Sequence, residues 1–184
     1  NIKINGATFR IVPMITFVAK AFHFSHANDD AFKTITKANL TTIPEGSEVF
    51  ISFGEIDGRP NEGFISATAK LDKPIEDLIF STVVGYLQWF SEHNKTWNHS
   101  INFLNVPAPM QDERCSSDVN ADVANVVASF NAQIKKQIVQ YEFNLIYVYR
   151  FTPGQDGFSN SQFYIDNYHL GAKALLEIEQ QLNS

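Results

Sequence analysis

Length, composition and charge exclude several classes of protein. The chain has 184 residues, of which 44% are hydrophobic and 18% charged, as is typical of one soluble globular domain. Its net charge of −6 argues against a nucleic-acid backbone or an anionic membrane surface as the main partner. The single cysteine, Cys115, excludes an internal disulfide and favours a reducing, cytoplasmic compartment. No apolar run is long enough to span a bilayer.

Predicted strands and helices alternate along the chain. Strands are expected at residues 9–12, 49–53, 101–106 and 144–149, where apolar and β-branched residues cluster. Helices are expected at 29–40, capped by Asn28 or Asp29, at 75–93, at 119–141 and at 172–182, where apolar residues recur at threes and fours. This order predicts an α/β fold, a three-layer sandwich with a central parallel sheet of flavodoxin-like type.

Polar residues follow the predicted strands at one edge of the sheet, where ligands of such folds bind. Glu55, Asp57 and Arg59 come directly after the strand at 49–53, and Asn105 closes the next strand. A Gly-rich loop over 152–161 follows the last strand, and an acid and a histidine precede the final helix. We expect all of these residues to face one crevice.

The acid and the histidine, Asp166 and His169, are three residues apart. A carboxylate beside an imidazole fixes its tautomer and stabilises the imidazolium, as a general base for a serine nucleophile requires. The structural alternative is that Asp166 caps the final helix and His169 is a partly buried aromatic residue.

Four sequence blocks together resemble a known family. They are Phe53-Gly54-Glu55-Ile56-Asp57-Gly58-Arg59-Pro60-Asn61-Glu62-Gly63, Asn105-Val106-Pro107-Ala108-Pro109, Gly157-Phe158-Ser159-Asn160 and Ile165-Asp166-x-x-His169-Leu170. The chain is similar over nearly its whole length to the SGNH (GDSL-like) hydrolase superfamily, and within it to an SGNH-like domain often found with tetratricopeptide repeats. The resemblance implies a Ser-His-Asp triad with His169 as the base and Asp166 as its orienting acid. It also implies a substrate and oxyanion side formed by Gly54, Glu55, Asp57, Arg59 and Asn105, with no cofactor and no metal.

Two departures from the family pattern concern catalysis. Family members usually open with a strand ending in Gly-Asp-Ser-His, which supplies the nucleophile; this block is not in the sequence, and the resemblance suggests that it lies just upstream of Asn1. Residues 1–184 are therefore expected to form a single SGNH-like domain without its first strand. The usual oxyanion block G-x-N-D reads Gly54-Glu55-Ile56-Asp57, so Ile56 replaces the asparagine donor, and Arg59 is a candidate substitute.

Other candidate sites have simpler structural interpretations. Ser159 lacks a strand-turn-helix elbow and more naturally makes turn hydrogen bonds, and Cys115 lies among acids that disfavour a thiolate. His23 and His26 have a chelating spacing, but a lone H-x-x-H in a solvated turn is not a metal site. Trp97, expected in a polar loop, is a candidate surface for stacking on a sugar.

The leading hypothesis is an ester hydrolase that acts on an acylated glycan or another small hydroxylated ester, with its serine supplied from upstream. The alternative is a non-catalytic domain, a pseudo-esterase that keeps the crevice and binds a glycan or a protein, and association with tetratricopeptide-repeat regions fits either hypothesis. A nucleotide-binding flavodoxin-like domain is disfavoured, because no Gly-rich phosphate loop follows a predicted strand.

Overall fold

A parallel sheet of three strands organises the chain, of which the computed structural model describes residues 1–154 and 156–183. The strands are β3 (Glu48–Ile51), β4 (Ser100–Leu104) and β5 (Asn144–Ile146), in the order β3-β4-β5. Val49 pairs with Ile101, and Phe103 pairs with both Ile51 and Leu145. The expectation that these three strands share one parallel sheet is confirmed, and the fold is mixed α/β.

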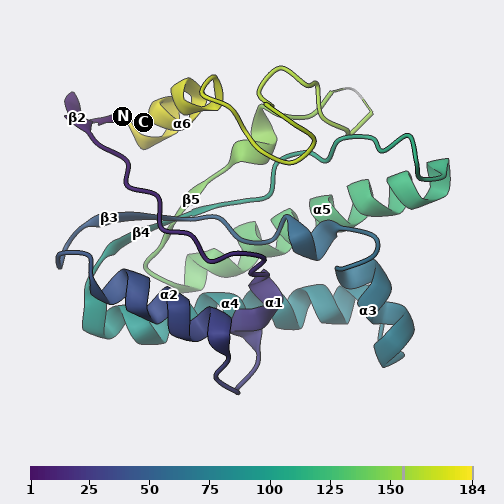
Figure 1. Cartoon of the computed structure of the whole chain (residues 1–184), viewed down its shortest axis with the longest axis horizontal. Coiled ribbons are helices and arrows are strands. Elements are labelled where there is room, and N and C mark those ends of the chain that lie inside the picture. Colours follow the sequence, from purple (N-terminus) through teal and green to yellow (C-terminus); the bar gives the residue numbers. More distant parts are fainter. Residues whose placement is uncertain (155, 184) are drawn as a thin grey trace.

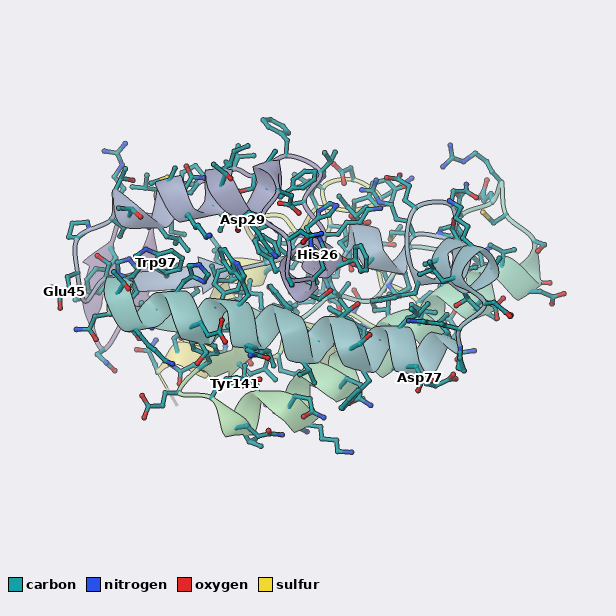
Figure 2. The ribbon with its side chains drawn as sticks, turned by 90° about the horizontal axis from the view of Figure 1, so that it is seen from below. His26, Asp29, Glu45, Asp77, Trp97 and Tyr141 are labelled. Carbon is teal, nitrogen blue, oxygen red and sulfur yellow. The ribbon has the colours of Figure 1, made fainter. Side chains whose placement is uncertain are left out.

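Helices connect the strands, as parallel pairing requires. Between β3 and β4 the chain forms α3 (Phe64–Leu71) and α4 (Ile75–Trp97), and between β4 and β5 it forms α5 (Ser117–Gln137). In Figure 1 α4 and α5 lie below the strands together with α1 (Ala21–Ser25) and α2 (Ala31–Thr41), whereas α6 (Ala174–Leu182) lies above them. Figure 2 shows α4 from below, with Asp77 near its start and Trp97 at its end.

The two faces of the sheet are buried unequally. Successive side chains of a strand point to opposite faces. The face toward α4 and α5 carries the main core, which includes Val49, Ile51, Ile101, Phe103, Val83, Leu87, Phe90, Phe130 and Ile134. The opposite face contributes to a smaller cluster, in which Ile146 and Val148 pack with Ile2 and with Ile178 of α6.

Local signals account for where the helices begin and end. The Asp30 side chain caps α2 by accepting the Lys33 N–H at 2.8 Å, one residue beyond the expected cap. Asn98 adopts a left-handed conformation (φ 52°) and ends α4, so this helix runs four residues past the expected His93. The Ser116 side chain caps α5, which gives way to a 3-10 turn at Ile138–Gln140 instead of continuing to Tyr141.

The N-terminus differs from the prediction. The expected strand at 9–12 is wrong: β1 (Ile2–Ile4) and β2 (Ala7–Phe9) form an antiparallel hairpin around Asn5 and Gly6, which both have positive φ. Asn-Gly is a strong hairpin signal, because a tight turn needs left-handed backbone at both positions. The hairpin lies beside α6, where the Lys3 N–H donates to Glu179 Oε1 at 2.9 Å.

After β2 the chain continues without regular structure to α1, and its apolar side chains face solvent. We call this stretch the apolar segment; it comprises Ile11, Val12, Met14, Ile15, Phe17 and Val18, which are 45–78% exposed. Within residues 1–154 and 156–183, every helix is too short or too polar to cross a lipid bilayer.

Candidate functional site

The first block of the site is a turn that begins where β3 ends. Gly54 has φ 122°, and a Cβ atom built on it would lie 2.5 Å from Phe130 Cε1 and 2.8 Å from Val106 Cγ2. Both the backbone conformation and the packing therefore require glycine at this position. The chain then enters a 3-10 turn, Ile56–Gly58, so the strand does not continue through Glu55 and Asp57 as a simple extension of β3.

Glu55 and Arg59 form an ion pair across this turn. Arg59 donates to both carboxylate oxygens of Glu55, from Nε at 3.0 Å and from Nη2 at 2.8 Å. A second acid, Glu62, lies 3.4 Å from Nη1. The neighbouring carboxylates raise the pKa of Arg59, chiefly through the hydrogen bonds to Glu55, and the guanidinium is held in a fixed orientation.

Asp57 does not face the crevice, contrary to expectation. Its carboxylate is buried and accepts the backbone N–H groups of Ala21 at 2.8 Å and Phe22 at 3.1 Å. Burial raises the pKa of Asp57 to about 6, even though the two N–H donors oppose that rise. Asp57 therefore fixes the start of α1 against the turn after β3, which is a structural task rather than contact with a substrate.

Asn105 is also buried and joins the ends of two strands. Its Oδ1 accepts the Tyr149 N–H at 3.0 Å, and its own N–H donates to Ile146 O at 3.2 Å. Its side-chain nitrogen Nδ2 is buried without an acceptor among the described residues. Asn105 is thus a rigidly oriented residue whose remaining donor is uncommitted.

The second block is the loop that carries Asp166 and His169. Asp166 Oδ2 lies 2.7 Å from His169 Nδ1, and Oδ1 accepts the N–H groups of Tyr168 and His169, both at 2.8 Å. These contacts lower the pKa of Asp166 to about 2, the Tyr168 N–H contributing most. The carboxylate does not cap α6, which begins at Ala174; it closes its own loop and also orients the imidazole.

Histidine and acid are both solvent-exposed, the side chains being 72% and 50% accessible. With Nδ1 bonded to a carboxylate, the tautomer carries its proton there, and Nε2 presents a lone pair. Among the described residues, Nε2 has no hydrogen-bond partner. The pair therefore has the orientation of a general base whose accepting nitrogen is unoccupied.

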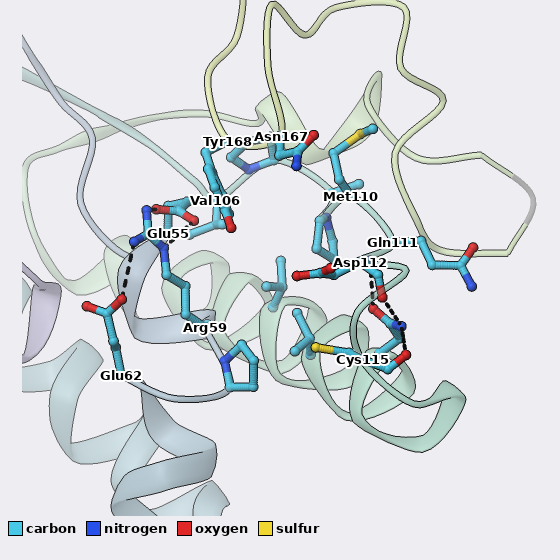
Figure 3. A pocket seen from close by; sticks show the side chains of 18 of the residues that line it. Glu55, Arg59, Glu62, Val106, Met110, Gln111, Asp112, Cys115, Asn167 and Tyr168 are labelled. Atoms are coloured by element: carbon cyan, nitrogen blue, oxygen red, sulfur yellow. Dashed lines mark hydrogen bonds and ion pairs between the residues drawn. The ribbon is translucent and has the colours of Figure 1, made fainter.

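Tyr168 brings the two blocks together, although more than a hundred residues separate them in sequence. The guanidinium carbon of Arg59 lies 4.5 Å from the centre of the Tyr168 ring, a cation–π contact. Figure 3 shows Tyr168 beside the Glu55–Arg59 pair, with Glu62 below it. Tyr168 is not among the site residues that the sequence predicts; its position inside the D-x-x-H block is the signal that points to it.

A cavity of about 410 Å³ opens beside this contact. Its lining includes Val106, Ala108 and Met110 after β4, Val123 and Val127 of α5, and residues of the two blocks. Figure 3 shows Arg59 and Glu62 across from Met110 and Cys115. Of the expected site residues, Glu55 and Arg59 belong to its lining. Gly54, Asp57 and Asn105 are not part of its lining, and neither are Asp166 and His169, which flank the lining residues Asn167 and Tyr168.

Within the described part of the chain, neither internal candidate nucleophile, Ser159 or Cys115, hydrogen-bonds to His169. Ser159 makes turn contacts: its N–H donates to Pro109 O at 2.8 Å and its Oγ accepts the Ser161 N–H at 3.0 Å. Cys115 lines the cavity on the α5 side, with its sulfur visible in Figure 3.

The two histidines of the H-x-x-H motif have separate partners. His23 stacks on Phe32 at 3.8 Å between ring centres, and its Nδ1 accepts the Lys20 N–H. His26 Nε2 lies 3.2 Å from Asp30. Across the part of the chain that the structure describes, no three His, Cys, Asp or Glu side chains gather in a way that could hold a metal ion.

Trp97 is not a sugar-stacking surface. It is the last residue of α4 rather than part of a loop, and it is buried, with its indole N–H donating to Thr41 Oγ1 at 3.3 Å. The prediction is wrong because α4 continues through Trp97 and ends only at the left-handed Asn98, and the Trp97 ring packs in the core.

A scan against family models finds no match to this chain. Searches of curated proteins and of solved structures find no significant similarity either.

Proposed function

We propose that this domain carries an ester-hydrolase site of the SGNH type, built on a three-layer α/β sandwich. The observation that carries the proposal is the 2.7 Å contact between Asp166 Oδ2 and His169 Nδ1 in a loop that adjoins a cavity at the carboxyl ends of parallel strands. The substrate class is a small hydroxylated ester, such as an acylated glycan.

His169 acts as the general base in this proposal. Nε2 takes the proton of the attacking hydroxyl, the imidazolium is stabilised by Asp166, and the same proton then passes to the leaving alcohol. The low pKa of Asp166, about 2, keeps the carboxylate charged at neutral pH and therefore able to stabilise the imidazolium.

The nucleophile is proposed to come from a strand that pairs with the outer edge of β3. Two features support this. Within residues 1–154 and 156–183 the strand β3 pairs only with β4, yet Val49, Phe50 and Ile51 form a continuous apolar run of the kind found in interior parallel strands. The apolar segment also leaves six large apolar side chains 45–78% exposed, which a further element could cover. A further strand with a Gly-Asp-Ser end would satisfy the open edge.

Arg59 and Asn105 take different parts on the oxyanion side. The strongest donors of Arg59 are already bonded to Glu55, so its proposed role is to position the His169 loop through Tyr168. Asn105 keeps an uncommitted Nδ2 donor next to Val106, which lines the cavity, and this favours Asn105 as the residue that meets developing negative charge.

A non-catalytic binding domain is the second candidate. The observation that favours it is that, within the described residues, no serine, threonine or cysteine hydrogen-bonds to His169 Nε2, while the cavity is already formed. A pseudo-esterase of this kind would bind the ligand without cleaving it.

Hydrolysis of p-nitrophenyl acetate separates the two candidates. Residues 1–184 alone should turn over this ester barely above background. The His-Asp pair can activate a water molecule, but without a serine no covalent intermediate forms, and catalysis is correspondingly weak. Addition of a preceding strand that ends in Gly-Asp-Ser should raise the rate by orders of magnitude, and His169→Ala should remove the gain. If the extended chain stays inactive although it is folded, the binding domain is the better description. Strong His169-dependent turnover by residues 1–184 alone would place the nucleophile inside the chain, with Ser159 tested first.

A further inference from the structure

We infer that the cavity binds an uncharged ligand through an apolar group and discriminates against anions. The identification of this ligand as a substrate rests on the proposed function. If the domain is an esterase, the ester that it cleaves is uncharged and places its aliphatic or aromatic acyl group in the cavity. The volume of about 410 Å³ lies at the lower end of the range for small-molecule sites.

The floor of the cavity has apolar side chains, and the backbone N–H and C=O groups of Val106 and Ala108 are already hydrogen-bonded. Both backbone groups of Val106 hydrogen-bond to the Asn131 side chain. The Val106 N–H donates to Asn131 Oδ1 at 2.9 Å, and the Val106 carbonyl accepts from Asn131 Nδ2 at 2.7 Å. The Ala108 N–H donates to Thr152 Oγ1 at 2.9 Å, and its carbonyl accepts the Tyr164 hydroxyl.

Proline takes the alternate positions of this floor. Pro107 and Pro109 have no N–H to offer, and Pro109 O already accepts the Ser159 N–H. An anion needs several free N–H donors, so this stretch cannot cradle a phosphate or a carboxylate. Val106, with Val123 and Val127 of α5, lines the cavity here and favours an apolar group instead.

The cations that line the cavity are already neutralised. Arg59 makes its two-point contact with Glu55, and Arg114 makes another with Asp112, from Nε at 2.9 Å and from Nη2 at 2.8 Å. Arg114 lowers the pKa of Asp112 to about 2, so this acid stays charged at neutral pH. With Glu62, three carboxylates and two guanidiniums line the cavity, a balance of −1. A bound anion would therefore meet arginines whose charge is already balanced and would be repelled by the carboxylates beside them.

Binding of hexanamide and of hexanoate tests this inference without any hydrolysis. The two probes share an acyl chain and differ in charge, and neither is cleaved. Backbone amide shifts of Met110, Val123 and Val127 in two-dimensional NMR report occupancy. We expect hexanamide to shift these amides to saturation with an affinity at least tenfold above that of hexanoate. Equal affinity, tighter binding of hexanoate, or no binding of either probe would overturn the inference.

Two variants locate the effect. Val123→Trp fills the cavity and should abolish hexanamide binding, whereas Val139→Trp, at an exposed position after α5, should leave it unchanged.

Glu55→Gln releases Arg59 and should raise hexanoate affinity at least fivefold, whereas the exposed Glu142→Gln should not. If Val123→Trp does not fold, the Glu55→Gln pair still decides: unchanged hexanoate affinity in Glu55→Gln contradicts the inference.

The outcomes separate this inference from the proposed function. Selective hexanamide binding by a chain that stays inactive after a Gly-Asp-Ser strand is added would leave the ligand class standing and remove the hydrolase. Hydrolysis that depends on His169, combined with equal binding of the two probes, would do the reverse.

Discussion

The two blocks that meet at the Arg59–Tyr168 contact are held in place by different physical means. The turn after β3 is fixed by packing: Gly54 lies against Phe130 and Val106, and Asp57 is enclosed at the start of α1. The loop before α6 is fixed by its own hydrogen bonds, with Asp166 bonded to the two residues that follow Asn167, and both Asp166 and His169 exposed.

This difference teaches which changes should damage the fold and which should damage only the site. A packed turn transmits a substitution into the core, because protein interiors are close-packed and relax only partly. An exposed loop held by local bonds can lose its geometry while the core stays intact. The first block is therefore expected to act as the rigid support and the second as the adjustable chemical part.

The largest effect is expected for Gly54→Ala. An added Cβ meets a φ of 122° and ring atoms of Phe130 at 2.5 Å, so we expect a loss of about 3 kcal/mol or more in the free energy of unfolding. Gly46→Ala is the matched control: φ is also positive, at 75°, but apart from the adjacent residues no described residue has an atom within 4 Å of the new Cβ, so the cost should be about 1 kcal/mol. Urea unfolding measures both, and similar losses for the two variants would contradict the packing argument.

An intermediate effect is expected from the titration of Asp57. Its folded pKa of about 6 lies above its ordinary value of 3.8, so the folded state holds the proton more tightly. The stability linked to this proton is complete below pH 3.8 and is lost as pH rises through about 6, an effect of up to about 3 kcal/mol.

Asp57→Asn isolates this titration, because the amide does not titrate. Between pH 4 and 7 the variant should lack the downward part of the stability curve that Asp57 contributes. Asp166→Asn is the control from the exposed loop: the pKa of Asp166 is lowered to about 2, so its contribution is present above pH 3.8 and is lost only as pH falls toward 2. Parallel curves for Asp57→Asn and the unaltered chain from pH 4 to 7 would show that Asp57 is not buried as described.

The sequence predicted the part of the molecule that follows from periodicity. Continuous apolar runs predict β3, β4 and β5 to within a few residues, because burial on both faces of a sheet leaves such runs. Apolar residues that recur at threes and fours predict α2, α4, α5 and α6, because each helix buries one face. Two short helices, α1 and α3, were missed, since five to eight residues contain too few turns to show a period. The strand predicted at 9–12 does not form, because the Asn5-Gly6 turn pairs residues 7–9 with residues 2–4 and ends the strand at Phe9.

The site was predictable only where its geometry is local. Asp166 and His169 are three residues apart, so their contact follows from short-range geometry, and the pairing of Glu55 with Arg59 is also local. The direction of Asp57 depends on α1, which precedes it by more than thirty residues, and the position of Tyr168 over Arg59 depends on how the loop folds back. Such long-range placement has no trace in a pattern of single residues.

The smallest effect is expected for Tyr168→Leu, which tests the contact between the two blocks. Leucine keeps an apolar side chain but removes the ring that lies 4.5 Å from the Arg59 guanidinium, so the free energy of unfolding should fall by only about 0.5–1 kcal/mol. The His169 loop should nevertheless lose its anchor, which NMR would detect as faster hydrogen exchange at the Tyr168 and His169 amide positions. The control is Tyr147→Leu, which removes a comparable contact with Lys135 outside the site, at 5.4 Å, and should leave exchange in the loop unchanged. Unaltered exchange in Tyr168→Leu would mean that Asp166 and the backbone hydrogen bonds of the loop, such as Ile165 N–H to His169 O, hold it without the ring, and Arg59 would then have no positioning role toward His169.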